Sequence, residues 1–210
     1  VSHMQYTPSP FSGFDIFNNM AVACVGRGTI AAAEAFEQLA DEYAQLAMQG
    51  KSTFRGEEKY RILFEGIACW ANLRFTYKTL QANGINLTAS VYGPAFSFLY
   101  SNLDELMAAY AYVPNSNCFE AEVQLRVRDA IKNKVDGAII HVNRSCKKWS
   151  GNLYEMERQL RERAGIPTVM FDGDQSDPRC FSEAQYETRI QALTEIMEAR
   201  RMKKEGAVHG

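Results

Sequence analysis

Near the start of the chain, apolar residues recur at steps of three and four positions, which is the spacing of one helix face. Residues 15–49 carry this pattern, and Gly50 ends it, as glycine often does just after a helix. Residues 5–13, rich in Pro and Ser, predict an extended lead-in, and the polar residues 51–59 predict a loop. We therefore expect a helical segment followed by a connection.

From residue 60 onward, short apolar runs alternate with longer amphipathic stretches. The apolar runs predict strands at residues 60–64, 87–91, 137–142 and 168–171. The amphipathic stretches predict helices at residues 73–81, 103–112, 120–132, 153–163 and 182 to about 201. Capping patterns support the last two helices, since Asn152 stands three positions before Glu155 and Ser182 stands three before Gln185.

Solidly apolar strands that alternate with helices are typical of a parallel sheet covered on both faces. The pattern predicts an α/β fold: a four-stranded doubly wound parallel sheet, Rossmann- or flavodoxin-like, of order 2-1-3-4, with an added N-terminal helical segment. We expect residues 60–204 to form the α/β domain and residues 5–59 the linker and helical segment. Residues 1–4 resemble an expression scar, and residues 205–210 a flexible tail.

Composition narrows the classes of protein that the chain can represent. It has 210 residues, 46% of them hydrophobic, and a net charge of −2. It therefore lacks the strongly basic balance that attracts nucleic acid, and no apolar run is long enough to span a membrane. The five cysteines are odd in number, widely spaced and free of C-x-x-C pairs, so we expect reduced thiols in a cytoplasmic protein.

Two cysteines follow strands whose carboxyl ends should be neighbours. Ligands bind open α/β sheets beyond the carboxyl ends of the strands, where the strand order reverses. In order 2-1-3-4 that point lies between the first and third strands, so Cys69 and Cys146 fall at the predicted crevice. Cys69 has few charged neighbours, and a core cysteine beside Trp70 is the favoured interpretation.

Cys146 has the stronger chemical signature, because Arg144, Lys147 and Lys148 surround it and a predicted helix follows. Nearby cations and a helix N-terminus both stabilise a thiolate, the form required of a nucleophile or an iron–sulfur ligand. A buried cysteine among solvated lysines is an equally weighted alternative.

Three other patterns resemble functional sites. Residues 26–31 match the G-x-G-x-x-A dinucleotide fingerprint, but no acidic-ended strand follows, so we expect only a break between helices there. The residues Asp174 and Asp177 suit turns better than a cation site, whereas Asp172 ends a strand and could face the crevice. His141 lies within a predicted strand and is expected to be a hydrogen-bonded core residue.

Longer motifs resemble one family of enzymes. They are "TPSPFSGFD" (residues 7–15), "ILFEGIACW" (62–70), "VYGPAF" (91–96), "VDGAIIHVNRSCKKWSG" (135–151) and "GIPTVMFDGDQSDPRCFSEAQYETR" (165–189). Together they resemble the 2-hydroxyacyl-CoA dehydratases, similar to 2-hydroxyglutaryl-CoA dehydratase, and most of all the C-terminal part of the beta-type subunit.

The resemblance implies a lyase of anaerobic amino acid fermentation that removes water from (R)-2-hydroxyacyl-CoA to give 2-enoyl-CoA. It implies ketyl radical chemistry and a heterodimer with an alpha-type subunit. A [4Fe–4S] cluster in each subunit and an ATP-dependent iron–sulfur activator protein are also implied.

By position in the motif, Cys146 would be a cluster ligand, with Arg144, Ser145 and Lys147 around the cluster. The family's other ligands come largely from an N-terminal domain not found in this chain, so we expect the chain alone to lack the cluster and be inactive. The cations could instead meet the CoA phosphates. Two alternatives are a benzoyl-CoA reductase-type subunit and a non-catalytic nucleotide- or partner-binding α/β module that uses residues 26–31.

Overall fold

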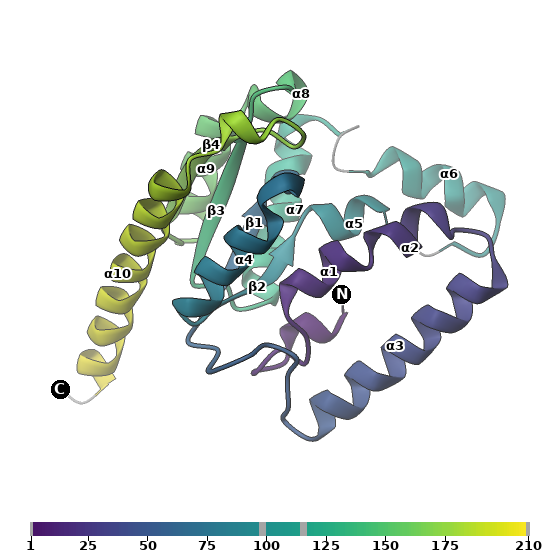
Figure 1. The fold of residues 1–210 in the computed structure, drawn as a ribbon, viewed down its shortest axis with the longest axis horizontal. Helices are drawn as coiled ribbons and strands as arrows, with labels where there is room; N and C mark the ends of the chain where they lie inside the picture. Colours follow the sequence, from purple (N-terminus) through teal and green to yellow (C-terminus); the bar gives the residue numbers. More distant parts are fainter. Residues whose placement is uncertain (1, 97–99, 114–116, 209–210) are drawn as a thin grey trace.

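Four parallel strands form the centre of the molecule in a computed structural model that describes residues 2–96, 100–113 and 117–208 (Figure 1). The strands are β1 (Tyr60–Glu65), β2 (Ile85–Ser90), β3 (Gly137–Asn143) and β4 (Thr168–Gly173), in the order β2-β1-β3-β4. The predicted fold class and strand order are confirmed. The second strand begins two residues earlier than its apolar run suggested.

The strands β1, β2 and β3 are buried almost throughout because helices cover both faces of the sheet. In β1, Ile62 and Phe64 join the core on one face, where Ile139 and Phe171 lie, and Leu63 joins the core on the other. Burying such a side chain contributes roughly 1.5–3 kcal/mol. Because apolar side chains of one strand point alternately to the two faces of the sheet, helices must cover both faces.

One face is covered by α1 (Gly13–Asn18), α4 (Leu73–Ala82) and α10 (Glu183–Val208). The last helix buries apolar side chains at helical spacing, namely Tyr186, Ile190, Leu193 and Met197. The backbone N–H of Gln185 donates to Ser182 Oγ at 3.4 Å, as the capping pattern predicted.

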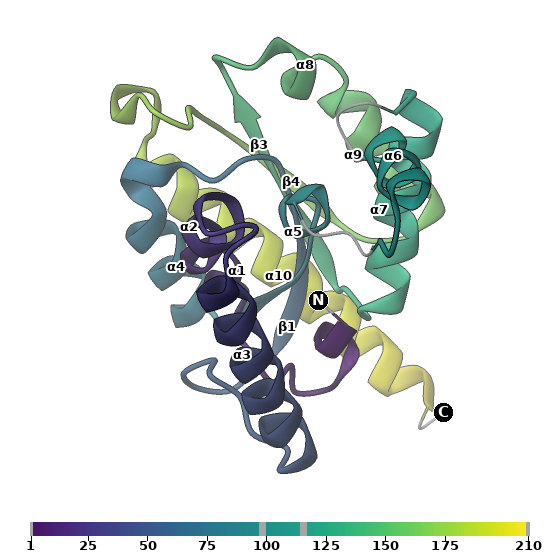
Figure 2. The same cartoon turned by 90° about the vertical axis from the view of Figure 1, so that its right-hand side faces the viewer.

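The other face is covered by α7 (Phe119–Lys132) and α9 (Leu153–Arg163), which lie across the strands from α4 in Figure 2. The bounds of α9 are those predicted. Asn152 stands at its N-cap position as expected, but its side chain makes no capping hydrogen bond.

The predicted helical segment at residues 15–49 is divided into α1, α2 (Met20–Val25) and α3 (Ile30–Met48). The break after Val25 confirms that residues 26–28 separate two helices, whereas the break at Asn19 was not predicted. Figure 1 shows α3 and α6 (Leu103–Ala111) on the side of the molecule opposite α10. In the described ranges, no helix has the length and apolar character needed to cross a membrane.

The other elements are short, and the hydrophobic pattern did not predict them. They are the helices α5 (Tyr92–Phe96) and α8 (Lys147–Ser150) and the 3-10 turns η1 (Ser2–Gln5), η2 (Trp70–Asn72) and η4 (Pro178–Cys180). Met4, in η1, is buried, and its carbonyl accepts a hydrogen bond from the Arg61 guanidinium.

Candidate functional site at the carboxyl edge of the sheet

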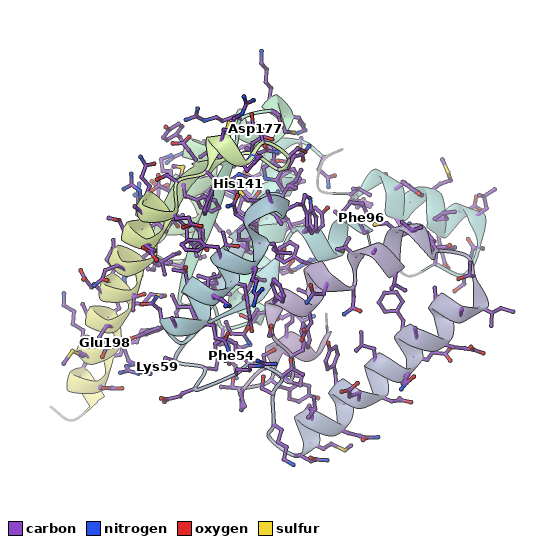
Figure 3. All side chains as sticks on the ribbon, in the orientation of Figure 1. Phe54, Lys59, Phe96, His141, Asp177 and Glu198 are labelled. Atoms are coloured by element: carbon purple, nitrogen blue, oxygen red, sulfur yellow. The ribbon has the colours of Figure 1, made fainter. Side chains whose placement is uncertain are left out.

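The loops that follow β1, β3 and β4 meet at one edge of the sheet. The first loop carries Cys69, the second carries Cys146, and Figure 3 labels His141 and Asp177 at this end of the molecule. Cys69 is 3% exposed, while Cys146 is half-buried against the cluster that contains Trp149. Of these two thiols, Cys69 is therefore buried and Cys146 is partly accessible. Cys180, in the loop after β4, is also partly exposed.

Cys69 and His141 form a buried polar pair between the first and third strands. His141 Nδ1 lies 2.5 Å from the Ile67 carbonyl oxygen, so this nitrogen carries the proton and donates. Nε2 is then free to accept a hydrogen bond from the Cys69 thiol, whose sulfur lies 3.2 Å away. The imidazole also stacks on Phe171, with 4.9 Å between ring centroids.

Burial keeps both members of this pair uncharged. It raises the pKa of Cys69 to about 12 and lowers the pKa of His141 below its usual value. The Cys69 side chain is thus a thiol at neutral pH. This agrees with the expected core cysteine and the expected core histidine.

Backbone and side-chain hydrogen bonds join the loop after β3 to the loop after β4. Arg144 N–H donates to the Gly173 carbonyl at 3.1 Å, and Ser145 N–H donates to Asp174 Oδ2 at 3.0 Å. The buried Asn143 side chain accepts from Gln175 N–H at 3.3 Å. These bonds fix the peptides immediately before Cys146.

The Asp-rich loop forms a turn, as its sequence predicted. Asp174 Oδ1 accepts from the backbone N–H groups of Ser176 and Asp177 at 2.9 and 3.0 Å. These bonds, with those from Ser145, lower the pKa of Asp174 to about 2. Asp172 is exposed, and its nearest cation is Arg144, at 4.0 Å from carboxylate to guanidinium.

The charges near Cys146 are partly compensated. Lys148 Nζ pairs with Glu122 at 2.9 Å, and Arg144 lies 4.0 Å from Asp172. Arg144, Lys147 and Lys148 are all exposed. The helix after Cys146 is α8, a single turn, so the helix-dipole contribution expected from a long helix is reduced. The hydrophobic pattern predicted only α9 because a four-residue turn carries too few positions to show a period.

One further charged pair at this edge was not predicted from the sequence. Arg126 of α7 makes a bidentate pair with Glu65, at 2.8 Å from Nε and 2.9 Å from Nη2, and both side chains are almost fully buried. The available signal was an acidic residue directly at the end of an apolar strand. Nothing in the sequence indicated which cation would meet it.

The described residues do not form a complete ligand set for a cubane cluster. Such a cluster is held by four thiolates, as a rule. Among residues 2–96, 100–113 and 117–208, no group of three or more His, Cys, Asp or Glu side chains is arranged to hold a metal ion. Cys69 is bonded to His141, which leaves Cys146 as the partly accessible sulfur of the two.

A large cavity lies elsewhere in the described part of the chain. It measures about 780 Å³ and lies between the α1–α2 pair and α3. Its lining includes Arg27, Gly28 and Thr29, which belong to the glycine pattern, and otherwise is mostly apolar. The helix α2, rather than a strand, precedes that pattern, so the local geometry of a dinucleotide site is absent there.

Comparison with known proteins gives one family and several relatives. A model of the family described as "2-hydroxyglutaryl-CoA dehydratase, D-component" matches residues 1–197. The (R)-phenyllactyl-CoA dehydratase alpha subunit of Clostridium sporogenes is 58% identical over 201 residues, which are 96% of this chain and 49% of that protein. The alpha subunit of (R)-2-hydroxyglutaryl-CoA dehydratase from Acidaminococcus fermentans is 53% identical, over 96% of this chain and 42% of that protein.

A more distant relative is one of the subunits of the benzoyl-CoA reductase of Thauera aromatica, 28% identical over 83% of this chain and 44% of that protein. The chain thus spans about half the length of the curated relatives it matches.

Proposed function

The chain belongs to the 2-hydroxyglutaryl-CoA dehydratase D-component family, and from this premise we propose that it is part of an alpha-type subunit of a 2-hydroxyacyl-CoA dehydratase. Such an enzyme is a hydro-lyase that converts an (R)-2-hydroxyacyl-CoA into a 2-enoyl-CoA. The identity of 58% over 96% of the chain is the observation that carries the proposal.

The subunit type differs from the one expected from the motifs. The expected family is confirmed, but the two dehydratase relatives named above are alpha subunits, which corrects the expected beta type. The quoted motifs indicated the family and were not sufficient to separate its subunit types. The proposed partner is therefore a second dehydratase subunit of the other type, together with an ATP-dependent iron–sulfur activator and the acyl-CoA substrate in the cytoplasm.

Within this enzyme, we propose that Cys146 supplies one ligand of a [4Fe–4S] cluster whose other ligands lie outside the described residues. The partial exposure of Cys146 at the sheet edge supports this role, and the buried, hydrogen-bonded Cys69 is the poorer candidate. Arg144 and Lys147 are exposed on either side of Cys146, so they can approach an anionic cluster or the CoA phosphates. Ser145 bonds to Asn143 within its own loop and to Asp174 of the loop after β4.

The alternatives have weaker support. Similarity to the reductase relative is about half the similarity to the phenyllactyl-CoA dehydratase relative, at 28% against 58% identity. The nucleotide-binding module lacks the strand that its glycine pattern requires.

The proposal is tested on the complete protein, produced without oxygen together with its partner subunit and activator. We expect dehydration of (R)-phenyllactyl-CoA or (R)-2-hydroxyglutaryl-CoA, measured as formation of the 2-enoyl-CoA by chromatography. We expect no reduction of benzoyl-CoA. Reduction of benzoyl-CoA without dehydration would replace the proposal with the reductase alternative.

The role of Cys146 is tested by Cys146→Ser in the same preparation. We expect loss of bound iron and of dehydration, whereas the control Cys24→Ser, at an exposed position of α2, retains both. If the Cys146→Ser enzyme keeps its iron content, Cys146 is not a ligand of the cluster.

A further inference from the structure

The loop after β4 is hydrogen-bonded to both of the loops that carry Cys69 and Cys146. On the β1 side, the Gln175 carbonyl accepts from Trp70 N–H at 3.3 Å. On the β3 side, Asp174 Oδ2 accepts from Ser145 N–H at 3.0 Å. Residues 173–175 therefore bridge the loops that follow β1 and β3.

Asp174 differs from the other acidic residues of this loop. It is 7% exposed, whereas Asp172 is exposed and Asp177 is bonded to the exposed Arg179. Its two carboxylate oxygens accept different hydrogen bonds. Oδ1 accepts from the backbone within its own turn, and Oδ2 accepts from Ser145 N–H in the neighbouring loop.

This division of tasks requires a carboxylate. An asparagine at position 174 has one acceptor oxygen and one N–H donor group. The oxygen can still close the turn, but the amide nitrogen would then face the N–H of Ser145, and two donors repel. Asp174→Asn should therefore break the contact between loops and preserve the turn.

The consequence falls on Cys146, the residue after Ser145. Its own backbone N–H bonds to the Asn143 carbonyl at 3.3 Å, and its side chain is half-buried beside Trp149. Without the hydrogen bond from Ser145 to Asp174, the loop of residues 143–146 opens more often and exposes the Cys146 sulfur.

We propose that Asp174 is a positioning residue, whose carboxylate holds the loop of residues 143–146 in one conformation and thereby fixes the place of the Cys146 sulfur. Its relevance to dehydration rests on the proposed function, but its effect on the loop does not.

The first test measures alkylation of each cysteine by iodoacetamide in this chain, followed by peptide mass spectrometry. We expect Asp174→Asn to raise the rate at Cys146 by about fivefold or more, the effect of one lost hydrogen bond. The exposed Cys24 and Cys118 serve as internal references and should keep their rates.

Asp177→Asn is the matched control, since Asp177 lies in the same loop and its carboxylate bonds only toward Arg179 in the described structure. Equal Cys146 rates in wild type, Asp174→Asn and Asp177→Asn would overturn the proposal. So would an equal rise at the buried Cys69, because it would mean general loosening of the fold.

A second measurement keeps the proposal testable if Asp174→Asn does not fold. Amide hydrogen exchange in the wild-type chain should show protection at Ser145, Ser176 and Asp177, all of which donate to Asp174. In folded Asp174→Asn, protection should be lost at Ser145 and kept at the other two. A wild-type Ser145 amide that exchanges at the unprotected rate would overturn the proposal.

These outcomes are separable from those of the proposed function. If Cys146→Ser leaves iron unchanged while Asp174→Asn accelerates alkylation, the loop assignment holds and the cluster role fails. If Cys146→Ser loses iron while Asp174→Asn changes neither alkylation nor exchange, the positioning role fails alone.

Discussion

At the scale of single residues, Gly173 stands where two buried side chains leave no room for another. A Cβ at this position would lie 2.7 Å from His141 Nε2 and 2.8 Å from Cys69 Sγ. We expect Gly173→Ala to lower the free energy of unfolding by about 1–3 kcal/mol, because the Cys69–His141 pair must shift. Urea unfolding measures the change.

Gly206→Ala is the control for that substitution. A Cβ at Gly206 in α10 meets nothing within 4 Å, and alanine is the better helix former, so stability should be unchanged or up to about 1 kcal/mol higher. If Gly173→Ala changes stability no more than Gly206→Ala does, the expectation of close packing around the Cys69–His141 pair is contradicted.

His141 gives the chain a pH-dependent stability. Burial lowers its pKa below 6.5, and it outweighs the carboxylates of Asp172 and Asp174, which act in the opposite direction. Below pH 6.5 the unfolded state therefore binds more protons than the folded state, and stability falls as pH falls. The loss for one proton is at most about 1.4 kcal/mol per pH unit.

We expect this loss in wild type as the pH falls below about 6.5, and a shallower loss in His141→Asn, which cannot titrate there. Urea unfolding at several pH values measures both slopes. Parallel slopes for the two proteins would mean that His141 is not the group responsible.

At the scale of elements, the Glu65–Arg126 pair joins the end of β1 to α7. Replacing Arg126 with Leu leaves an unpaired carboxylate in a site that is almost closed to water. We expect a loss of about 3–5 kcal/mol in the free energy of unfolding, measured by urea unfolding.

The double variant Glu65→Leu with Arg126→Leu should recover most of that loss, because it removes the unpaired charge as well. Arg128→Leu, on the exposed side of the same helix, should change stability little. A double variant as unstable as Arg126→Leu would show that packing, rather than the charge, dominates at this position.

At the scale of the whole molecule, stability should be uneven. The helix α3 buries only Ala32, and the cavity of about 780 Å³ separates it from α1 and α2. The helix α9, in contrast, buries Leu153, Met156 and Leu160 against the sheet. Few buried apolar contacts mean a low free energy of local opening.

Amide hydrogen exchange should therefore be faster in α3 than in α9, although both are regular helices. Exchange of both helices at the rate of β3 would show that the molecule opens only as one unit and would contradict this expectation.

The hydrophobic pattern determined the architecture because architecture depends on local periodicity. Continuous apolar runs indicated which segments are strands, and their alternation with helices suggested a doubly wound sheet of order 2-1-3-4, which the structure has. The handedness of the crossovers then placed helices on both faces. The same reasoning placed Cys69 and Cys146 at one edge. The pattern did not predict α5 and α8, since helices of five and four residues show no period.

Which side chains meet at that edge was decided only by the tertiary structure. Cys69 and His141 are 72 positions apart, Glu65 and Arg126 are 61 apart, and Ser145 and Asp174 are 29 apart. Periodicity reports whether a residue faces the core or the solvent, and it carries no information on which distant residue shares the same space. The sequence therefore determined the sheet and placed Cys69 and Cys146 at the same edge, while packing of the loops determined that Cys69 is buried and Cys146 is partly accessible.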